Sequence, residues 1–166
     1  DTDMQPDLVW IKDRTSTGYQ SVIDAVRGAS KNLYTNDASA EGTGNFLTAF
    51  GSDGFTVGGV NSDTNHTDGN HNYVAWCWKA NGSGTANIAG SINTTKTSAN
   101  TTSGISINTF SGTGSNATIG HGLGIAPTVI LCKNMGSGSD NWNWNNFSIS
   151  ALGNTGRYYF NENAGN

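Results

Sequence analysis

The chain has 166 residues, of which 34% are hydrophobic and 12% are charged, and its formal net charge is −4. A chain of this length fits one domain, or two small domains that share a core. The acidic balance and the lack of a Lys/Arg cluster exclude an ordinary nucleic-acid-binding surface, because binding to phosphates requires concentrated positive charge. No apolar run approaches the roughly 18 residues of a membrane-spanning helix, so no membrane insertion is expected.

The composition predicts an all-β protein with many turns. Short apolar runs alternate with stretches of small polar residues, and 23 of the residues are glycine. Such a pattern is typical of short strands joined by tight turns. Five Trp, five Tyr and six Phe supply material for a compact core. We therefore expect an antiparallel β-sandwich of the jelly-roll type.

The first expected strand covers residues 8–12, and Pro6 stands in front of it. Proline is tolerated at the start of a strand, where it costs only one ladder hydrogen bond. Residues 21–27 fit either a strand or a helix, because their apolar positions suit both periods. A turn at 28–30 and a strand at 32–36 should follow, which together predict a hairpin.

The next segments also carry hairpin signals. Residues 46–50 and 55–57 flank the turn-like segment 51–54, which predicts a second hairpin. Residues 58–72 are expected to form a long exposed loop. Residues 73–79 (YVAWCWK) are the most hydrophobic segment, with apolar side chains on both faces of a strand. We therefore expect this strand in the middle of a sheet, packed on both sides.

The second half of the chain begins with a polar stretch. Residues 82–103 are rich in Asn, Gly, Ser and Thr and are expected to form a linker or a weakly packed excursion. Alternation at 105–110 predicts a short strand. A glycine-dense turn at 120–124 then leads into a second apolar run behind Pro127.

Residues 127–134 repeat the pattern of residues 6–13, with the same leading proline, four apolar residues and the same lysine. Farther on, residues 153–162 align with residues 28–37. A self-match at one long separation indicates a duplicated module. Chance likeness between two strands is the alternative, since strands resemble one another in composition. Chance strands do not usually share the following hairpin too.

The repeat divides the chain into a first β module (1–81), a linker (82–103) and a partial second β module (104–166). Alternation at 147–151, the expected counterpart of 21–27, favours strands for both segments. Each copy lacks elements that the other has. Either the chain is a segment of a longer repeat protein, which we favour, or the strands of 105–126 complete the first module. The first alternative predicts an open sheet edge, and such edges invite pairing with another chain.

Five motifs, at 6–12, 26–29, 52–58, 72–79 and 120–127, resemble an uncharacterised repeat domain of tailed bacteriophages. That domain is frequent in marine and cyanobacterial phages, in virion surface and tail-fibre-like proteins. The resemblance covers nearly the whole chain and keeps the order of the motifs. It implies a virion structural protein, either a fibre or appendage subunit or a capsid-decorating subunit. Its expected partners are other virion subunits, including further copies of itself, and the resemblance brings no catalytic residues and no cofactor.

One loop collects residues that bind metals in other proteins, namely Asp63, His66, Asp68 and His71. Imidazoles and carboxylates can hold a transition metal, and carboxylates can hold Ca²⁺. The spacing matches neither a zinc finger nor an EF-hand loop. We therefore expect a solvated loop without a bound metal.

A glycan-binding segment is the main alternative function. Trp142 and Trp144 are interleaved with Asn143 and Asn145, and we expect this segment to be an exposed insertion in the second copy. Exposed rings suit the apolar faces of sugars, and amides suit their hydroxyls. Host surface polysaccharide would then be the ligand. The other interpretation is that one or both indoles pack into a core or a subunit interface.

An enzyme is not expected. His121 lies between two glycines without a nucleophile elbow nearby in the sequence, which favours a turn histidine bonded to the neighbouring backbone. Asp24, Glu41 and Asp53 would be the carboxylates of a polysaccharide depolymerase. The sequence places no two of them at the separation that this chemistry requires.

Both cysteines, Cys77 and Cys132, lie in apolar strand-like runs. Buried free thiols are the expected state, because unpaired Cys behaves as a small hydrophobe, and a disulfide is the alternative. Cys132 aligns with Ile11 in the repeat. That position therefore requires an apolar side chain rather than sulfur chemistry.

Overall fold

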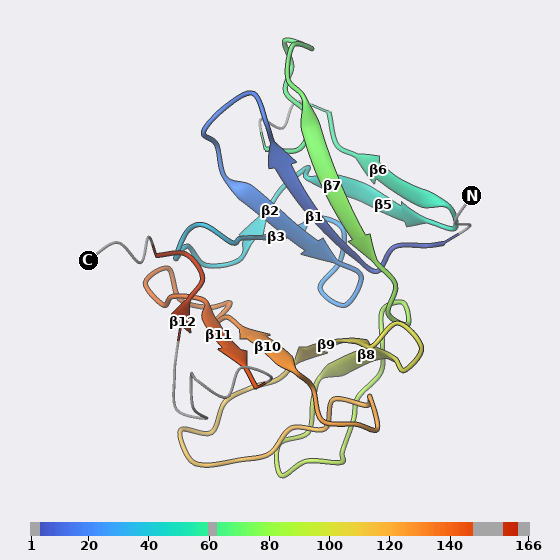
Figure 1. Cartoon of the computed structure of the whole chain (residues 1–166), viewed down its shortest axis with the longest axis vertical. Helices are drawn as coiled ribbons and strands as arrows, with labels where there is room; N and C mark the ends of the chain where they lie inside the picture. Colours follow the sequence, from blue (N-terminus) through green and yellow to red (C-terminus); the bar gives the residue numbers. More distant parts are fainter. Residues whose placement is uncertain (1–3, 60–62, 148–157, 163–166) are drawn as a thin grey trace.

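The computed structural model of the chain describes residues 4–59, 63–147 and 158–162. Within these ranges the chain forms β-strands joined by turns and loops, and all paired strands run antiparallel (Figure 1). None of the described residues belongs to a helix that could cross a membrane. The predicted all-β, antiparallel fold is confirmed.

The largest sheet has five strands in the order β4-β3-β2-β1-β7. They are β1 (Leu8–Asp13), β2 (Gln20–Asp24), β3 (Lys31–Tyr34), β4 (Gly42–Thr43) and β7 (Tyr73–Trp78). The first four form a meander, and β7 returns to the free side of β1. Alternation along β1 buries Val9, Ile11 and Asp13 on one face and leaves the intervening side chains half-buried on the other.

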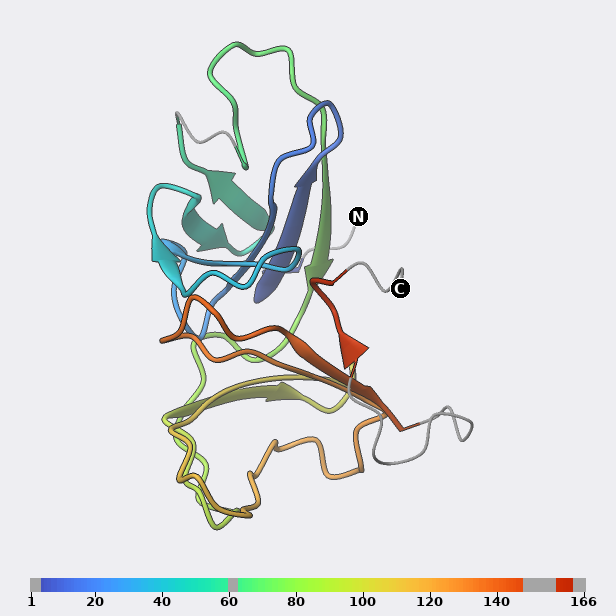
Figure 2. The same ribbon diagram turned by 90° about the vertical axis from the view of Figure 1, so that its left-hand side faces the viewer.

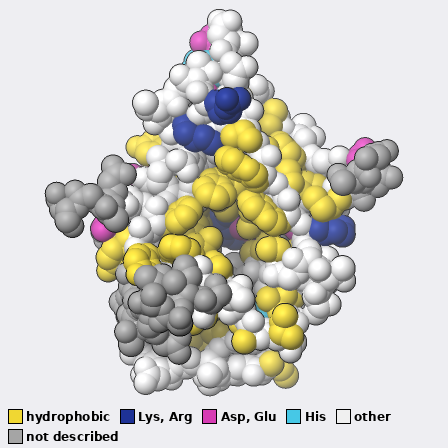
Figure 3. Space-filling view, in the orientation of Figure 1, with side chains coloured by type: hydrophobic (Ala, Val, Ile, Leu, Met, Phe, Trp, Pro, Cys, Tyr) yellow, Lys and Arg dark blue, Asp and Glu magenta, His cyan; other side chains and the backbone are white. Residues whose placement is uncertain are grey.

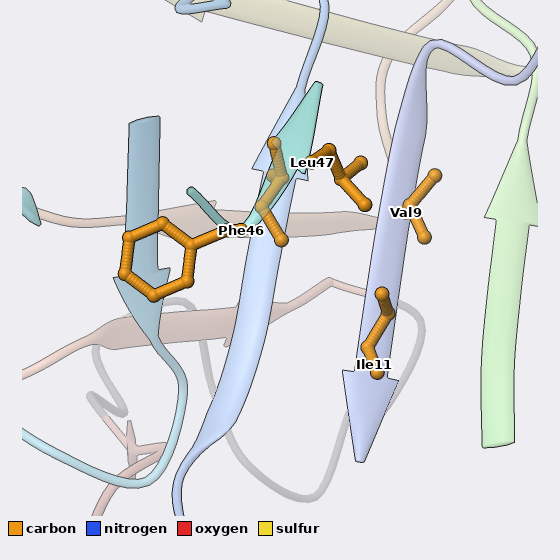
Figure 4. Packing of buried hydrophobic residues seen from close by; sticks show 5 residues of the cluster. Val9, Ile11, Phe46 and Leu47 are labelled. Carbon is orange, nitrogen blue, oxygen red and sulfur yellow. The ribbon is translucent and has the colours of Figure 1, made fainter. Parts of the chain in front are cut away.

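The core lies on the buried face of this sheet. The hairpin of β5 (Leu47–Gly51) and β6 (Gly54–Val57) covers that face, as predicted for residues 46–57. Figure 2 shows the hairpin on one side of the five-stranded sheet. Five buried apolar side chains meet between the two layers, of which four are labelled in Figure 4: Val9, Ile11, Ile23, Phe46 and Leu47.

The other half of the chain contains two smaller sheets. They are formed by β8 (Lys96–Asn100) with β9 (Ile105–Thr109), and by β10 (Val129–Cys132), β11 (Asn143–Asn146) and β12 (Tyr158–Tyr159). Strand β9 confirms the prediction at 105–110. Strand β8 lies inside the segment predicted to be a linker, and that prediction was wrong for residues 96–100. The sequence shows no apolar alternation there, because the fully buried residue of this strand is polar. It is Ser98, whose hydroxyl oxygen accepts a hydrogen bond from the Asn81 N–H at 2.7 Å.

The β10–β12 sheet and the β1–β3 meander make matching backbone hydrogen bonds. In the β1–β3 meander, Ala25 N–H donates to Asp7 O, and in the β10–β12 sheet, Phe147 N–H donates to Thr128 O, both at 2.8 Å. Two further bonds of β1–β3 are Thr35 N–H to Gln20 O and Gln20 N–H to Asn36 Oδ1. Their counterparts are Phe160 N–H to Trp142 O and Trp142 N–H to Asn161 Oδ1. The two sets follow the sequence alignment of 28–37 with 153–162.

Two lysines also occupy matching places. Lys12 Nζ donates to the carbonyl oxygens of Asp13, Ser16 and Gly18 at 2.5, 3.0 and 3.2 Å. Lys133 Nζ donates to those of Asn134, Ser137 and Ala38 at 3.0, 3.2 and 3.0 Å. An ammonium group has three donors, and here all three go to backbone acceptors. Each lysine therefore organises the loop that follows its strand.

Three hydrogen bonds join the second meander to the first sheet. Lys133 binds Ala38 O, the Trp142 indole N–H donates to Tyr34 O at 2.7 Å, and Glu41 N–H donates to Met135 O at 2.9 Å. The meanders therefore pack together through β3 and the loop behind it. The predicted division at 81 and 104 stays a prediction.

Two strand predictions differ from the structure. The strand expected at 147–151 lies earlier, at 143–146, and residues 148–151 fall outside the described part. The strand at 73–79 was expected inside a sheet, but β7 is an edge strand, and Ala75, Trp76 and Cys77 are exposed. The apolar sequence of β7 indicates that both of its faces can be buried. Its position at the edge of the sheet is decided by which other strands pair beside it.

We predict that Lys12→Met lowers the free energy of unfolding by at least about 2 kcal/mol, because three backbone acceptors lose their donor and even one hydrogen bond to a charged group contributes about 1.5–3 kcal/mol. Urea unfolding followed by Trp fluorescence measures this loss. Lys79→Met is the matched control, since Lys79 is exposed, and it should stay within about 0.5 kcal/mol of the unaltered protein. Equal effects of the two substitutions would contradict the role given to Lys12.

Candidate functional site

The outer face of the five-stranded sheet carries an aromatic cluster formed by Trp10, Trp76 and Phe160. Trp10 and Trp76 are opposite each other in the β1–β7 register, and their ring centroids lie 5.4 Å apart. Phe160, just after β12, lies 5.7 Å from Trp10. Trp76 remains 45% exposed. Figure 3 shows hydrophobic side chains gathered across the middle of this face, over the five-stranded sheet.

Strand β10 is a second apolar surface. All four of its residues are exposed, with Val129, Ile130 and Leu131 at 46%, 40% and 49%. Within the described part of the chain, β10 pairs only with β11. Strand β1, which resembles β10 in sequence, has partners on both edges, β2 and β7. The same kind of sequence is therefore buried in the first meander and exposed in the second.

The segment considered for glycan binding, residues 141–146, does not form an exposed insertion. Trp142 is only 7% exposed, and its indole N–H is bonded to Tyr34 O, which agrees with the other interpretation, that an indole of this segment packs into a core. Asn143, Trp144 and Asn145 are half-buried on β11, not on an inserted loop. The Trp144 ring lies 5.7 Å from that of Tyr158. An insertion was expected here, whereas in the structure the segment is the middle strand of the β10–β12 sheet. Sugar binding by these residues stays a prediction.

The two histidines of the predicted metal loop lie against each other. The His66 and His71 rings are stacked, with centroids 4.1 Å apart and planes at 6°. Asp68 is near both, with Oδ1 3.1 Å from His66 Nδ1 and Oδ2 3.5 Å from His71 Nε2. Asp63 is not part of this group, because it accepts a hydrogen bond from the Tyr34 hydroxyl at 2.7 Å. The structure therefore brings together three of the four candidates.

This arrangement fits an ion-paired cluster better than a metal site. The ligand atoms of His66, Asp68 and His71 all lie within 4.8 Å of one another. A coordinated ion lies close to the plane of each imidazole that binds it, at roughly 2.1 Å from the nitrogen. Parallel rings separated by 4.1 Å meet that condition only if one of them turns. Metal binding at this loop stays a prediction, and we do not favour it.

The buried acid Asp13 is a functional neighbour that the sequence analysis missed. His71 Nδ1 lies 2.5 Å from Asp13 Oδ2, although the two residues are far apart in the sequence. Burial disfavours the charged carboxylate, but hydrogen bonds from Ser16, His71 and the Thr15 N–H outweigh it and hold the pKa of Asp13 well below its usual range. Conversely, the hydrogen bond to Asp13 raises the pKa of His71.

The residues considered for catalysis have other partners. Arg27 lies between two of the carboxylates, with Nε 2.6 Å from Asp24 and an NH group 3.4 Å from Glu41. Asp53 is in the turn between β5 and β6 and is exposed. His121 Nδ1 accepts a hydrogen bond from the Leu123 N–H at 3.3 Å, which confirms the predicted turn role. Asp24, Glu41 and His121 thus have partners within the fold.

Both cysteines are free thiols and both are exposed, so the expectation of burial was wrong. Cys77 lies on edge strand β7 and Cys132 on edge strand β10. Both thiols are exposed although their neighbours in the sequence are apolar, because β7 and β10 lie at the edges of their sheets.

Residues 1–165 match the family described as "Domain of unknown function (DUF7483)". The chain belongs to this family. No curated protein and no solved structure matches it significantly. What this DUF7483 domain does must therefore be argued from its own surface, on which the apolar strands β7 and β10 stand out.

We predict that the domain loses stability as pH rises from about 5.5 to 8.5. The contribution of Asp13, whose pKa is depressed, is complete above the unfolded value of about 3.9 and constant in this window. The contribution of His71, whose pKa is raised, is complete below about 6.5 and disappears as pH rises through the folded value.

Urea unfolding at a series of pH values measures this loss. The substitution His71→Gln should flatten the curve in that window, whereas His121→Gln should leave its shape unchanged. An unaltered slope in His71→Gln would show that this histidine has no charged partner in solution.

Proposed function

We propose that this DUF7483 domain is a structural component of a bacteriophage particle surface and acts by binding other subunits. The phage assignment is supported by the motif resemblance at 6–12, 26–29, 52–58, 72–79 and 120–127. The assembly role is supported by one structural observation, the two uncharged apolar strands β7 and β10 at open sheet edges. Contiguous apolar surface of this kind marks interaction sites in soluble proteins.

We further propose that β10–β12 are a partial second copy of β1–β3. Support comes from the matching backbone bonds, the two lysines that bind loop carbonyls, and the equal strand order. Two sheets packed face to face, with the β5–β6 hairpin as the smaller layer, make the first copy a small sandwich. Repeat units usually bury their hydrophobic surface against a neighbour rather than alone.

The exposed apolar residues explain why assembly is favoured over isolated function. Trp76, Val129, Ile130, Leu131 and Phe147 are each at least 40% exposed. Burying such a side chain contributes about 1.5–3 kcal/mol. Several of them contributing together provide enough free energy for association, after the loss of translational and rotational freedom is subtracted. The same surface left in water would reduce solubility.

Location is tested on the particle. If the proposal holds, electron microscopy of intact virions from a phage that encodes this chain will show the domain on the outer surface of the tail or the capsid. Mass spectrometry of purified virions provides an independent measurement. Absence of the chain from purified, infectious particles would overturn the virion role.

Assembly is tested in solution. Sedimentation velocity of the isolated chain should show species larger than the monomer that increase with concentration, and Leu131→Lys should shift the population to monomer. A charge on an edge strand disfavours edge pairing. Ile88→Lys is the matched control, because Ile88 is 77% exposed but lies outside β7 and β10. A monomer at all concentrations, or equal effects of both substitutions, would contradict the assembly role.

A further inference from the structure

We propose that β7 of one copy pairs antiparallel with β10 of a second copy, so that the two sheets join edge to edge. This inference rests on the assembly role proposed above and names its partner and contact. Figure 1 shows β7 at the side of the five-stranded sheet in the upper half and β10 in the lower half. Two different edges meet, so each copy offers one of each kind.

The first meander provides the template. There, β1 accepts β7 along one edge, in a register that places Leu8 opposite Trp78 and Trp10 opposite Trp76. Strand β10 is the counterpart of β1, but the corresponding edge has no partner strand in the described part of the chain. A strand with this apolar pattern therefore accepts an antiparallel apolar strand on that edge in the first meander. In the proposed contact, β7 of the second copy would present its open edge, because its other edge is already paired with β1.

The backbone groups on the β10 edge can be identified. Phe147 N–H donates to Thr128 O, which makes residues 128 and 147 a hydrogen-bonded pair. Hydrogen-bonded pairs alternate along an antiparallel ladder, so Ile130 and Cys132 also direct their N–H and C=O groups toward β11. The corresponding groups of Val129 and Leu131 point to the open edge.

The open edge of β7 follows from the same rule. Arg14 N–H donates to Asn72 O, so Val74, Trp76 and Trp78 direct their backbone groups toward β1. Ala75 and Cys77 direct theirs to the opposite side, which has no strand beside it among the described residues. Each strand thus offers backbone N–H and C=O groups at its open edge for pairing, from Ala75 and Cys77 on β7 and from Val129 and Leu131 on β10.

These rows define a register. Cys77 of one copy would pair with Val129 of the other, and Ala75 with Leu131, which brings Trp76 opposite Ile130. The indole and the isoleucine are 45% and 40% exposed in the single chain, and cross-strand pairing would cover both. Aromatic and β-branched side chains are favourable cross-strand partners.

The other open edges of the described sheets fit less well. Strands β4 and β12 have two residues each, and β8 and β9 are mostly polar. Strands β5 and β6 are uncharged and four or more residues long, but their large apolar side chains belong to the core or pack against it. Strands β7 and β10 combine four or more residues, exposed apolar side chains and no charge. Charged residues and short length are the usual protections of an edge against pairing, and these two strands lack both.

A contact between two different edges is head-to-tail. Each copy keeps one unused β7 edge or one unused β10 edge, so further copies add until a ring closes or a filament grows. A contact of β10 with β10, or of β7 with β7, would instead give a symmetric dimer and stop. A single thiol on β7 in one variant and on β10 in the other distinguishes these cases.

The experiment uses two variants with one thiol each and a short bismaleimide crosslinker. One is Cys132→Ser, which keeps Cys77. The other, called the Cys77→Ser sample, also carries Cys132→Ser and Val129→Cys, which puts its thiol directly opposite Cys77 on the same face of the joined sheet, at a Cα separation of roughly 5.5 Å in the proposed register. The mixture of the two variants should give crosslinked dimers, and each variant alone should give none. The mixture in urea is the control for random collision.

Three other outcomes would overturn the pairing. Dimers in the Cys77→Ser sample alone would show that β10 meets β10, and dimers in the Cys132→Ser sample alone would show that β7 meets β7. No crosslink in any sample, while sedimentation still shows assembly, would leave the assembly role standing and refute this contact. If neither crosslinks nor larger species form, both proposals fail.

A blocking variant gives a second readout. Leu131→Pro, introduced into the Cys77→Ser sample, removes an N–H that points to the open edge and not to β11, so the β10–β11 ladder keeps its bonds. We expect the crosslinked fraction of the mixture to fall strongly while circular dichroism stays unchanged. An unchanged crosslinked fraction in this folded variant would contradict the proposed ladder.

Discussion

The pairing of β1 along both of its edges is the constraint on which the rest of the structure depends. With β2 on one side and β7 on the other, the backbone groups of β1 are satisfied, and Val9 and Ile11 become almost fully buried under the β5–β6 hairpin. Strand β10 has a similar sequence and the same kind of neighbour on one side only. It is exposed along its whole length, and among the described residues it pairs with β11 alone.

That constraint also determines what each face of the sheet presents. Since side chains alternate along a strand, the burial of Val9 and Ile11 places Trp10 on the opposite face, against Trp76. At the end of β1 the alternation buries Asp13, whose carboxylate then requires partners and finds Ser16 and His71. The contact between His71 and Asp13 thus joins the histidine loop to the sheet, and the His66 ring stacks on the ring of His71.

Polar chemistry in the described part of the chain is mostly used for folding. Lys12 and Lys133 bind loop carbonyls, Arg27 binds Asp24 and Glu41, and Asp7 accepts a hydrogen bond from the Ala80 N–H at 2.8 Å. Each of these groups serves a neighbouring segment of backbone or an opposite charge. Exposed apolar side chains gather on β7 and β10 without such a use, and for this reason we propose that the function lies in contacts between subunits.

The all-β class, the two hairpins of the first half and the likeness of 6–13 to 127–134 could be read from the sequence, because strand alternation, turn residues and a repeated lysine are local signals. The sheet order could not, since pairing partners are distant in the sequence. A run such as YVAWCW indicates apolar surface to be covered, and only the tertiary structure decided that β7 lies at an edge. Likewise, Trp142 looked exposed by composition but is buried, because its indole N–H reaches a carbonyl on β3, a contact set by how the two meanders pack.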